Sequence, residues 1–197
     1  IHGEYVKIIA ADDAFFNERV LSQAKNALDN SPNGIITSDV LKCDTHLGNP
    51  KRYQNLLQKY INNLSPKEVF SKLCVHNGII SGGVFFKKAF FDTFGVFDEA
   101  YRLLEDWPMW LRVTRAGCQI VYEPFCSVLY RANEGIGTGT NPIYMADKKR
   151  VLLTEIIPAR KEIGYINYLK ARFSFFLLNS LTVRRLYAFV FRRKTTV

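Results

Sequence analysis

The chain has 197 residues, of which 48% are hydrophobic and 23% are charged, a composition typical of a folded domain and not of a disordered chain. Its net charge of +9 suits nucleic acid, anionic lipid or a phosphorylated small molecule as a partner. The four cysteines form no C-x-x-C pair, and a chain of this size does not need disulfide bonds. We therefore expect reduced thiols and a cytoplasmic protein.

The first part of the chain predicts a strand, a helix and a second strand, in that order. Residues 4–11 are rich in β-branched and aromatic side chains and end abruptly at Asp12 and Asp13. Apolar residues on one face predict a helix over 17–28, and residues 35–41 form the second strand. This order is typical of α/β domains, whose ligands bind beyond the carboxyl ends of strands. We therefore expect Asp12 and Asp13 to lie at a binding site.

The middle of the chain predicts helices on either side of a strand that two glycines interrupt. Residues 65–75 begin with a Ser cap, a first-turn Pro and a Glu, which is the signature of a helix start. Residues 79–86 predict a strand, in which Gly82 and Gly83 indicate either a plain bulge or the close approach of a ligand. A short helix over 87–94 follows, closed by a glycine.

A loop turns into a helix at Glu105 and Asp106, where two adjacent carboxylates precede two tryptophans. Trp107 and Trp110 follow at helical spacing, which predicts one apolar and buried side. Asp106 is well placed as the N-cap, because exposed backbone N–H groups there favour a negative charge. Taken alone, the acidic pair indicates a capped core helix with an acidic first turn, and only the rest of the chain favours a functional role.

The last third of the chain predicts a glycine-rich loop followed by helices. Residues 132–141 lack the spacing of a dinucleotide or phosphate loop, and we expect them to act as a mobile lid. From residue 142 to 163 the pattern is helical, with Pro158 bending or breaking the helix. Residues 168–194 then combine aromatic residues and leucines with seven basic residues and no acidic one.

The basic and aromatic stretch 168–194 has no apolar run near the ~20 residues that a membrane-spanning helix needs. An amphipathic helix in peripheral contact with an anionic membrane surface fits the composition better. The alternatives are a helix packed on the domain by its aromatic face and an oligomer contact. Nucleic acid is not expected as a partner, because the basic residues gather at one tail and no nucleic-acid-binding motif is present.

Several of these motifs occur together in the order and spacing of a known family. They are Gly3-Glu4-Tyr5-Val6-Lys7, Asp12-Asp13, Ser81-Gly82-Gly83, Phe97-Asp98-Glu99, Glu105-Asp106-Trp107 and Tyr130-Arg131. Over roughly residues 3–135 the chain resembles the family-2 glycosyltransferases of the GT-A fold. The resemblance implies an α/β fold of GT-A type, a Rossmann-like mixed sheet flanked by helices. We expect 1–140 to be the C-terminal part of such a domain and 141–197 to be a C-terminal helical extension.

The resemblance implies transfer of a sugar from a nucleotide-sugar donor, for example a UDP-sugar, to an acceptor hydroxyl, with inversion at the anomeric carbon. The acceptor would be a saccharide or a lipid-linked glycan in cell-surface polysaccharide synthesis. The expected location is the cytoplasm, with peripheral contact at the inner membrane face through residues 168–194.

The family's catalytic roles fall on the two carboxylate pairs. By the resemblance, Asp12 and Asp13 hold Mg²⁺ or Mn²⁺, which clamps the phosphates of the leaving group. Asp106 is the general base that takes the acceptor proton, and an inverting displacement needs this base opposite the leaving group. Glu105 orients the base or binds an acceptor hydroxyl. These roles require the end of the first strand and the start of the tryptophan-bearing helix to face one cleft.

The resemblance also implies a set of substrate-binding residues. Ser81, Gly82 and Gly83 would form the pocket wall at the donor sugar or acceptor. Arg131 would offset the charge of the diphosphate. Trp107 would stack on a sugar ring, although packing in the core is the commoner fate of such a residue.

The chain departs from the family pattern at three points. Ala10 occupies the first acidic position of the Asp-x-Asp metal motif, and Asp12 matches the second. Many relatives carry a metal-binding His shortly after the Tyr-Arg pair, where this chain has Asn133. The family's N-terminal half, which grips the nucleotide base, has no counterpart before Gly3, so we expect the chain to be a fragment.

Three other functions compete with sugar transfer. The first is a non-catalytic sugar- or membrane-surface-binding fragment of the same fold. The second is a nucleotidyltransferase, which also uses carboxylates at strand ends and a metal ion. The third is a nucleic-acid-binding protein, which only the net charge suggests and which predicts a strongly salt-dependent affinity.

Overall fold

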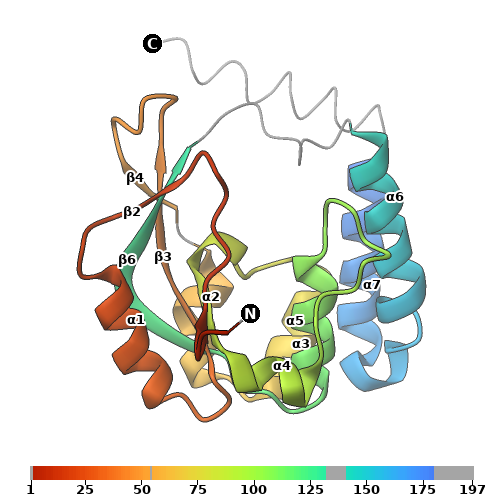
Figure 1. The fold of residues 1–197 in the computed structure, drawn as a ribbon. Helices are drawn as coiled ribbons and strands as arrows, with labels where there is room; N and C mark the ends of the chain where they lie inside the picture. Colours follow the sequence, from red (N-terminus) through yellow and green to blue (C-terminus); the bar gives the residue numbers. More distant parts are fainter. Residues whose placement is uncertain (1, 54, 132–140, 180–197) are drawn as a thin grey trace.

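The computed structural model describes residues 2–53, 55–131 and 141–179, in which a curled mixed sheet is flanked by helices (Figure 1). The strands are β1 (Tyr5–Val6), β2 (Ala14–Phe15), β3 (Ile35–Cys43), β4 (Lys51–Tyr53), β5 (Val84–Lys87) and β6 (Val121–Arg131). The helices are α1 (Val20–Asp29), α2 (Leu56–Tyr60), α3 (Pro66–Val75), α4 (Lys88–Phe94), α5 (Asp106–Arg115), α6 (Pro142–Val151) and α7 (Arg160–Asn179). Shorter turns are the 3-10 helices η1 (Ile61–Asn63) and η2 (Ser81–Gly83) and the π-helix η3 (Leu152–Ile156). The predicted α/β class is confirmed.

The sheet is built around β3, and its strands run in the order β1-β5-β3-β6-β2, with β4 also beside β3. β3 pairs in parallel with β6 and antiparallel with β4 and β5. The register between β3 and β6 shifts on both sides of Asp39, opposite the part of β6 that contains Pro124. Proline cannot donate a ladder hydrogen bond and is found at bulges, which accounts for the register shift beside Pro124.

Helices cover both faces of the sheet. On one face, α1 packs Val20 and Leu28 against Ile36 of β3. On the other face, Ile35 belongs to a larger core that includes side chains of α3 and α5. Adjacent residues of β3 point to opposite faces because side chains alternate along a strand, which is how one strand serves both cores.

The first strand is shorter than predicted. Of the residues 4–11 that favour a strand, only β1 pairs, and its partner is β5. β1 is the edge of the sheet, so the segment has no second neighbour with which to continue the ladder. From Lys7 the chain leaves β1, and the Lys7 ammonium donates hydrogen bonds to the carbonyl oxygens of Gly82 and Val84. The chain returns to the sheet at β2, which pairs with β6.

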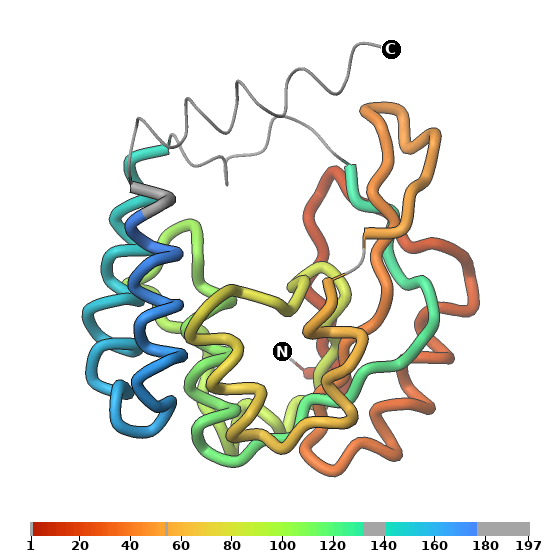
Figure 2. Tube along the Cα trace, turned by 180° about the vertical axis from the view of Figure 1, so that it is seen from behind, coloured from red at the N-terminus to blue at the C-terminus, as the bar shows by residue number. Residues whose placement is uncertain are grey.

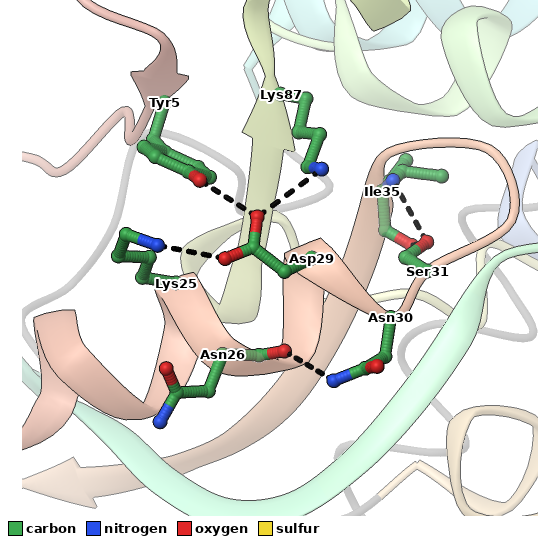
Figure 3. A network of polar contacts seen from close by, with 8 residues as sticks. All are labelled: Tyr5, Lys25, Asn26, Asp29, Asn30, Ser31, Ile35 and Lys87. Atoms are coloured by element: carbon green, nitrogen blue, oxygen red, sulfur yellow. Dashed lines mark hydrogen bonds and ion pairs between the residues drawn. The ribbon is translucent and has the colours of Figure 1, made fainter.

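A network of polar side chains on the surface ties β1, α1 and β5 together (Figure 3). Asp29, the last residue of α1, accepts a hydrogen bond from the hydroxyl of Tyr5 at 2.7 Å. It also pairs with Lys25 at 2.7 Å and with Lys87 at 3.2 Å. The bond from Lys25 contributes most to holding the pKa of the Asp29 carboxyl well below its usual range. The edge strand is therefore held by side chains as well as by its backbone.

The two glycines after the third helix form a tight turn. Residues 81–83 make up η2 and β5 begins only at Val84, so the first half of the strand predicted over 79–86 is wrong. Gly83 is buried against β3, and a Cβ on it would lie 2.3 Å from the carbonyl oxygen of Ser38. The close approach that requires glycine at position 83 is therefore made by the protein's own backbone.

The described C-terminal helices pack into the larger core, at the edge of the molecule opposite α1 (Figures 1 and 2). The buried residues that these helices contribute to the larger core are Val151, Ile156, Ala159, Ile163, Ala171 and Phe175. The helical run breaks at the turn that contains Pro158, as predicted, and α7 is kinked at Gly164, where φ is 76°. In the part of the chain that the structure describes, no helix has the length and apolar character required to traverse a bilayer.

Candidate active site

A pocket of about 700 Å³ is formed between the segment after β1, the start of α5 and the C-terminal helices. It brings together residues of both predicted carboxylate pairs. The predicted site residues that line it are Asp13, Ser81, Gly82, Glu105, Asp106 and Trp107. One pocket therefore contains both Asp13, from the segment after β1, and Asp106, from the start of the tryptophan-bearing helix.

Asp106 is the first residue of α5 and lies half-buried in the pocket. Its Oδ2 accepts a hydrogen bond from Nδ2 of Asn77 at 3.2 Å, and its Oδ1 accepts one from the backbone N–H of Trp107 at 2.7 Å. Burial raises the pKa of Asp106 to about 6, while the bond from Asn77 opposes the rise and the charge of Glu105 adds to it. A carboxyl group that titrates near neutral pH is suited to accept a proton in catalysis.

The predicted capping role of Asp106 is wrong, because the helix begins one residue earlier. Glu105 occupies the N-cap position with helical backbone angles, φ −68° and ψ −24°, and no side chain caps the helix. The Asp106 carboxylate instead turns to its own neighbour Trp107 and to Asn77. Glu105 is exposed and also lines the pocket.

Asp13 enters the same pocket from the segment between β1 and β2. Its Oδ1 accepts a hydrogen bond from the backbone N–H of Arg131 at 2.9 Å, which fixes the carboxylate beside the end of β6. Burial raises the pKa of Asp13, and the bond from Arg131 opposes the rise. Asp12 is exposed and does not line the pocket. The pocket therefore joins Asp13 with Asp106 and leaves Asp12 outside.

The residues predicted to bind substrate divide into two groups. Ser81, Gly82 and Trp107 line the pocket, whereas Gly83 and Arg131 do not. Trp107 is 3% exposed, its Nε1 donates a hydrogen bond to the carbonyl oxygen of Leu73 at 2.8 Å, and its ring stacks on Phe175 at 5.9 Å between centroids. The core packing that is the commoner fate of such a tryptophan is confirmed.

A divalent cation needs hard oxygen ligands, and the adjacent carboxylates of Asp12 and Asp13 have this chemistry. Within the described ranges, no three His, Cys, Asp or Glu side chains gather to hold a metal ion. Mg²⁺ is usually held by one or two carboxylates together with water and substrate phosphates. Asp13 therefore offers the pocket one carboxylate, Asp12 lies outside it, and the two residues do not form a complete metal site alone.

Several pocket residues have no signal in the sequence. They are His76, Asn77, Tyr144, Lys148, Ser174 and Phe175. The first two follow α3, and the other four belong to the helices expected as a separate extension. They become neighbours of Asp106 only through tertiary packing, and no motif or spacing in the chain marks them.

Asp147 of α6 holds the loop that leads into α5. The residue is buried, and its Oδ2 accepts hydrogen bonds from the backbone N–H groups of Arg102 at 2.9 Å and Leu103 at 2.8 Å. A carboxylate that receives two backbone donors forms strong, charge-assisted bonds. The first helix of the C-terminal extension therefore fixes the position of the loop just before Glu105 and Asp106.

Two predictions fall wholly or partly outside the described residues. The glycine-rich loop with Asn133 lies outside, except that Asn141 at its end caps α6 by accepting a hydrogen bond from the N–H of Ile143 at 2.9 Å. Of the basic and aromatic stretch 168–194, the described part ends with α7.

Comparison of the chain with protein-family models finds no matching model, and comparison with curated proteins finds no matching relative. The case for a function therefore depends on the pocket and on the motifs that contribute to it.

Proposed function

We propose that the protein is an inverting glycosyltransferase that moves a sugar from a nucleotide-sugar donor to an acceptor hydroxyl. The observation that carries the proposal is that Asp13 and Asp106 line one pocket. A displacement with inversion needs charge stabilisation at the leaving group and a base at the acceptor, on opposite faces of the sugar. The GT-A form of the fold is part of the proposal, and the mixed α/β sheet is compatible with it, although many functions share such sheets.

On the acceptor side, Asp106 takes the proton of the acceptor hydroxyl as its oxygen attacks the anomeric carbon. The bond from the anomeric carbon to the phosphate oxygen breaks, and the nucleoside diphosphate leaves with the electron pair. General-base catalysis of this kind contributes ~10²–10⁴-fold to the rate. Asn77 donates a hydrogen bond to Oδ2 of Asp106, and its own Oδ1 is buried with no partner among the described residues. Glu105 orients the base or binds a second acceptor hydroxyl.

On the donor side, Asp12 and Asp13 would hold Mg²⁺ or Mn²⁺, and the donor would be a nucleoside-diphosphate sugar, for example a UDP-sugar. A bound cation supplies positive charge to the leaving diphosphate. Arg131 adds positive charge from the end of β6. Ser81 and Gly82 form the wall beside the sugar, and Gly83 lets this wall lie against β3 in the core. Trp107 supports the wall from its stacked position on Phe175 and offers the sugar an apolar edge.

The proposed setting is the cytoplasm, with peripheral contact at the inner membrane face and a saccharide or lipid-linked glycan as acceptor. All four cysteines are free, and three of them are buried. Burial raises the pKa values of Cys74 and Cys118 to about 12, so these thiols stay protonated and unreactive. Free thiols of this kind are typical of a reducing compartment.

A donor panel tests the proposal. The full-length protein is incubated with UDP-, GDP- and dTDP-sugars and a saccharide mixture in the presence of Mn²⁺, and the release of nucleoside diphosphate is measured. We expect release from one donor class, loss of release on chelation of the metal, and a product of opposite anomeric configuration by NMR. A product of retained configuration, or no release from any donor, would contradict the proposal.

The alternative is a non-catalytic sugar- or membrane-surface-binding fragment of the same fold. Ala10 at the first acidic position of the metal motif favours it, as does the absence of a three-ligand metal cluster from the described residues. Saccharide binding without release of nucleoside diphosphate in the donor panel would support this alternative.

A further inference from the structure

The last described helix carries an exposed row of large apolar side chains. The outer face of α7, defined as Tyr165, Ile166, Leu169, Phe173 and Phe176, consists of residues that are 47–73% exposed. Single apolar residues on a surface are normal, whereas a continuous row along one helix marks an interaction site. Figure 2 shows α7 beside α6 in the group of C-terminal helices, at the end of the molecule opposite α1.

Helix geometry places this outer face away from the core. At about 100° per residue, its five side chains fall within a sector about 100° wide. Ala171 and Phe175, which are buried in the larger core, project about half a turn away from the centre of that sector. The helix therefore has two apolar faces, of which the protein's own core covers one.

Basic residues flank the outer face on both sides. On the same projection, Lys170 lies about 90° to one side of the centre and Arg172 about 70° to the other. Both residues are exposed. Residues 163–197 contain no acidic residue, and Glu162, just before the kink in α7, pairs with Arg115. The outer face thus presents apolar side chains with one basic side chain on each flank.

This charge pattern favours anionic lipid over a second copy of the chain. A face-to-face pair of α7 helices would bring Lys170 and Arg172 of both copies together without acidic partners, the reverse of the charge pairing that supports helix dimers. In an interfacial helix, apolar side chains enter the headgroup region and flanking Lys and Arg side chains reach the phosphates. Residues 180–197 continue this composition with five basic residues.

We propose that the outer face of α7 binds the protein to an anionic lipid surface. Phe175, on the inner face of the same helix, stacks on Trp107 and lines the pocket. Membrane binding through α7 would therefore hold the pocket close to the lipid. The use of this arrangement rests on the proposed function, because it would keep the pocket one helix diameter, ~10 Å, from a surface that carries a lipid-linked acceptor.

The test is co-sedimentation of the full chain with vesicles of phosphatidylcholine and phosphatidylglycerol in equal parts, with pure phosphatidylcholine vesicles as the neutral reference. We expect the wild type to bind the anionic vesicles. The double variant Ile166→Ser/Phe173→Ser should lose at least about tenfold in partitioning, because it removes two inserted apolar side chains. Lys170→Gln/Arg172→Gln should weaken binding to anionic vesicles and leave the binding to neutral vesicles unchanged.

The matched control is Leu21→Ser/Val96→Ser, which removes apolar side chains from residues that are 57% and 67% exposed and lie outside α7. This control should bind anionic vesicles like the wild type. Equal losses in the control and in Ile166→Ser/Phe173→Ser, or a wild type that ignores anionic vesicles, would overturn the proposal. The proposal would also be overturned if the wild type formed a dimer without lipid and Ile166→Ser/Phe173→Ser were a monomer. A second copy of the chain would then cover the outer face of α7.

Vesicle binding does not require sugar transfer, so the two proposals fail separately. Intact vesicle binding without turnover of any donor would contradict the proposed function alone. Donor turnover by a protein that does not bind anionic vesicles would contradict the lipid-binding role of α7 and the proposed membrane setting, and would leave the proposed sugar transfer in place.

Discussion

Asp106 and Asp13 are half-buried carboxyl groups at one pocket, yet their surroundings differ in charge. Asp106 receives hydrogen bonds from neutral donors, among them the side-chain amide of Asn77. Asp13 receives its bond from the backbone of Arg131, and both the negative charge of Asp12 and the positive charges of Lys7 and Arg131 act on it. Burial raises the pKa of both groups, to about 6 for Asp106, and the two cations oppose the rise only at Asp13.

The difference suits the two carboxyl groups to different chemistry. A carboxyl group that gains and loses its proton near pH 6 can act as a base at neutral pH. A carboxylate with cationic neighbours keeps its ionised form more readily and is the better ligand for a further cation. Titratable groups with unlike environments at one cavity are typical of catalytic sites. Four experiments, on these two residues and on Asn77, would break or sharpen the comparison.

The largest effect is expected for Asp106→Asn in the full-length protein. Its kcat for sugar transfer should fall ~10²–10⁴-fold, because an amide cannot accept the acceptor proton. Asp92→Asn is the matched control, since Asp92 is an exposed carboxylate outside the pocket, and it should retain the rate. The kcat values of the wild type and of the two variants are measured from initial rates at saturating donor and compared. Equal losses in the two variants would remove Asp106 from the role of base.

A smaller effect is expected for Asp13→Asn on cation affinity. Calorimetric titration of Mn²⁺ in the presence of UDP should show at least about a tenfold weaker affinity, since a charged ligand is lost. The Asn side chain can still accept the hydrogen bond from Arg131, so the local fold is kept. Asp12→Asn should weaken the Mn²⁺ affinity less than Asp13→Asn does, because Asp12 is exposed and solvated. Unchanged Mn²⁺ affinity in Asp13→Asn would assign the cation elsewhere.

The stability of the protein should depend on pH through Asp106. Between pH 3.8 and about 6, the folded protein binds more protons at Asp106 than the unfolded chain does, so its free energy of unfolding falls as pH rises. Asp106→Asn should abolish this fall and raise the free energy of unfolding at about pH 8 by about 1–2 kcal/mol, after allowance for partial solvent exposure. Urea unfolding across this pH range measures the difference. A variant less stable than the wild type at about pH 8 would contradict the environment assigned to Asp106.

The smallest effect is expected for Asn77→Ala on the pH–rate profile. The base must be ionised, so kcat/KM should decrease as pH falls through about 6. Asn77→Ala removes a hydrogen bond that favours the ionised carboxylate, and the midpoint of this limb should move to higher pH. Ser174→Ala is the control at the same pocket and should leave the midpoint in place. A midpoint that both variants shift equally would not belong to Asp106.

Local rules account for the elements that the sequence predicts well. The start of α3 depends on Ser65 and Glu68, whose side chains bond to each other's backbone N–H within one turn. The end of α4 depends on Gly95, whose φ of 78° few other residues adopt. Such features need only near neighbours in the chain, and the α/β class follows from the order of the elements.

Features that need distant neighbours are predicted poorly. Residues 4–11 favour a strand, but the sheet offers them an edge with one partner. Nothing in the sequence shows that Gly83 meets Ser38, or that Asn77 lies within 3.2 Å of Asp106. The motifs locate the carboxylate pairs without showing which member faces the cavity, because burial is decided by tertiary packing.

The C-terminal helix shows the same limit. Its aromatic residues predict either a face packed on the domain or a face for another partner, and α7 has both. Phe175 packs on the core, whereas Phe173 and Phe176 are 60% and 65% exposed. Composition alone cannot divide neighbouring aromatic residues between two faces, since the division depends on where the helix meets α3 and α5.

The central claim is that the carboxylate assigned to the cation and the carboxyl assigned to the proton share one pocket. Paramagnetic broadening by Mn²⁺ tests it most directly, because a bound Mn²⁺ ion relaxes the NMR signals of nearby nuclei. With Mn²⁺ and UDP, we predict broadening of the side-chain amide of Asn77, its loss in Asp13→Asn, and a sharp side-chain amide for Asn26 on α1. Broadening at Asn77 that survives Asp13→Asn, or equal broadening at Asn26, would contradict the account.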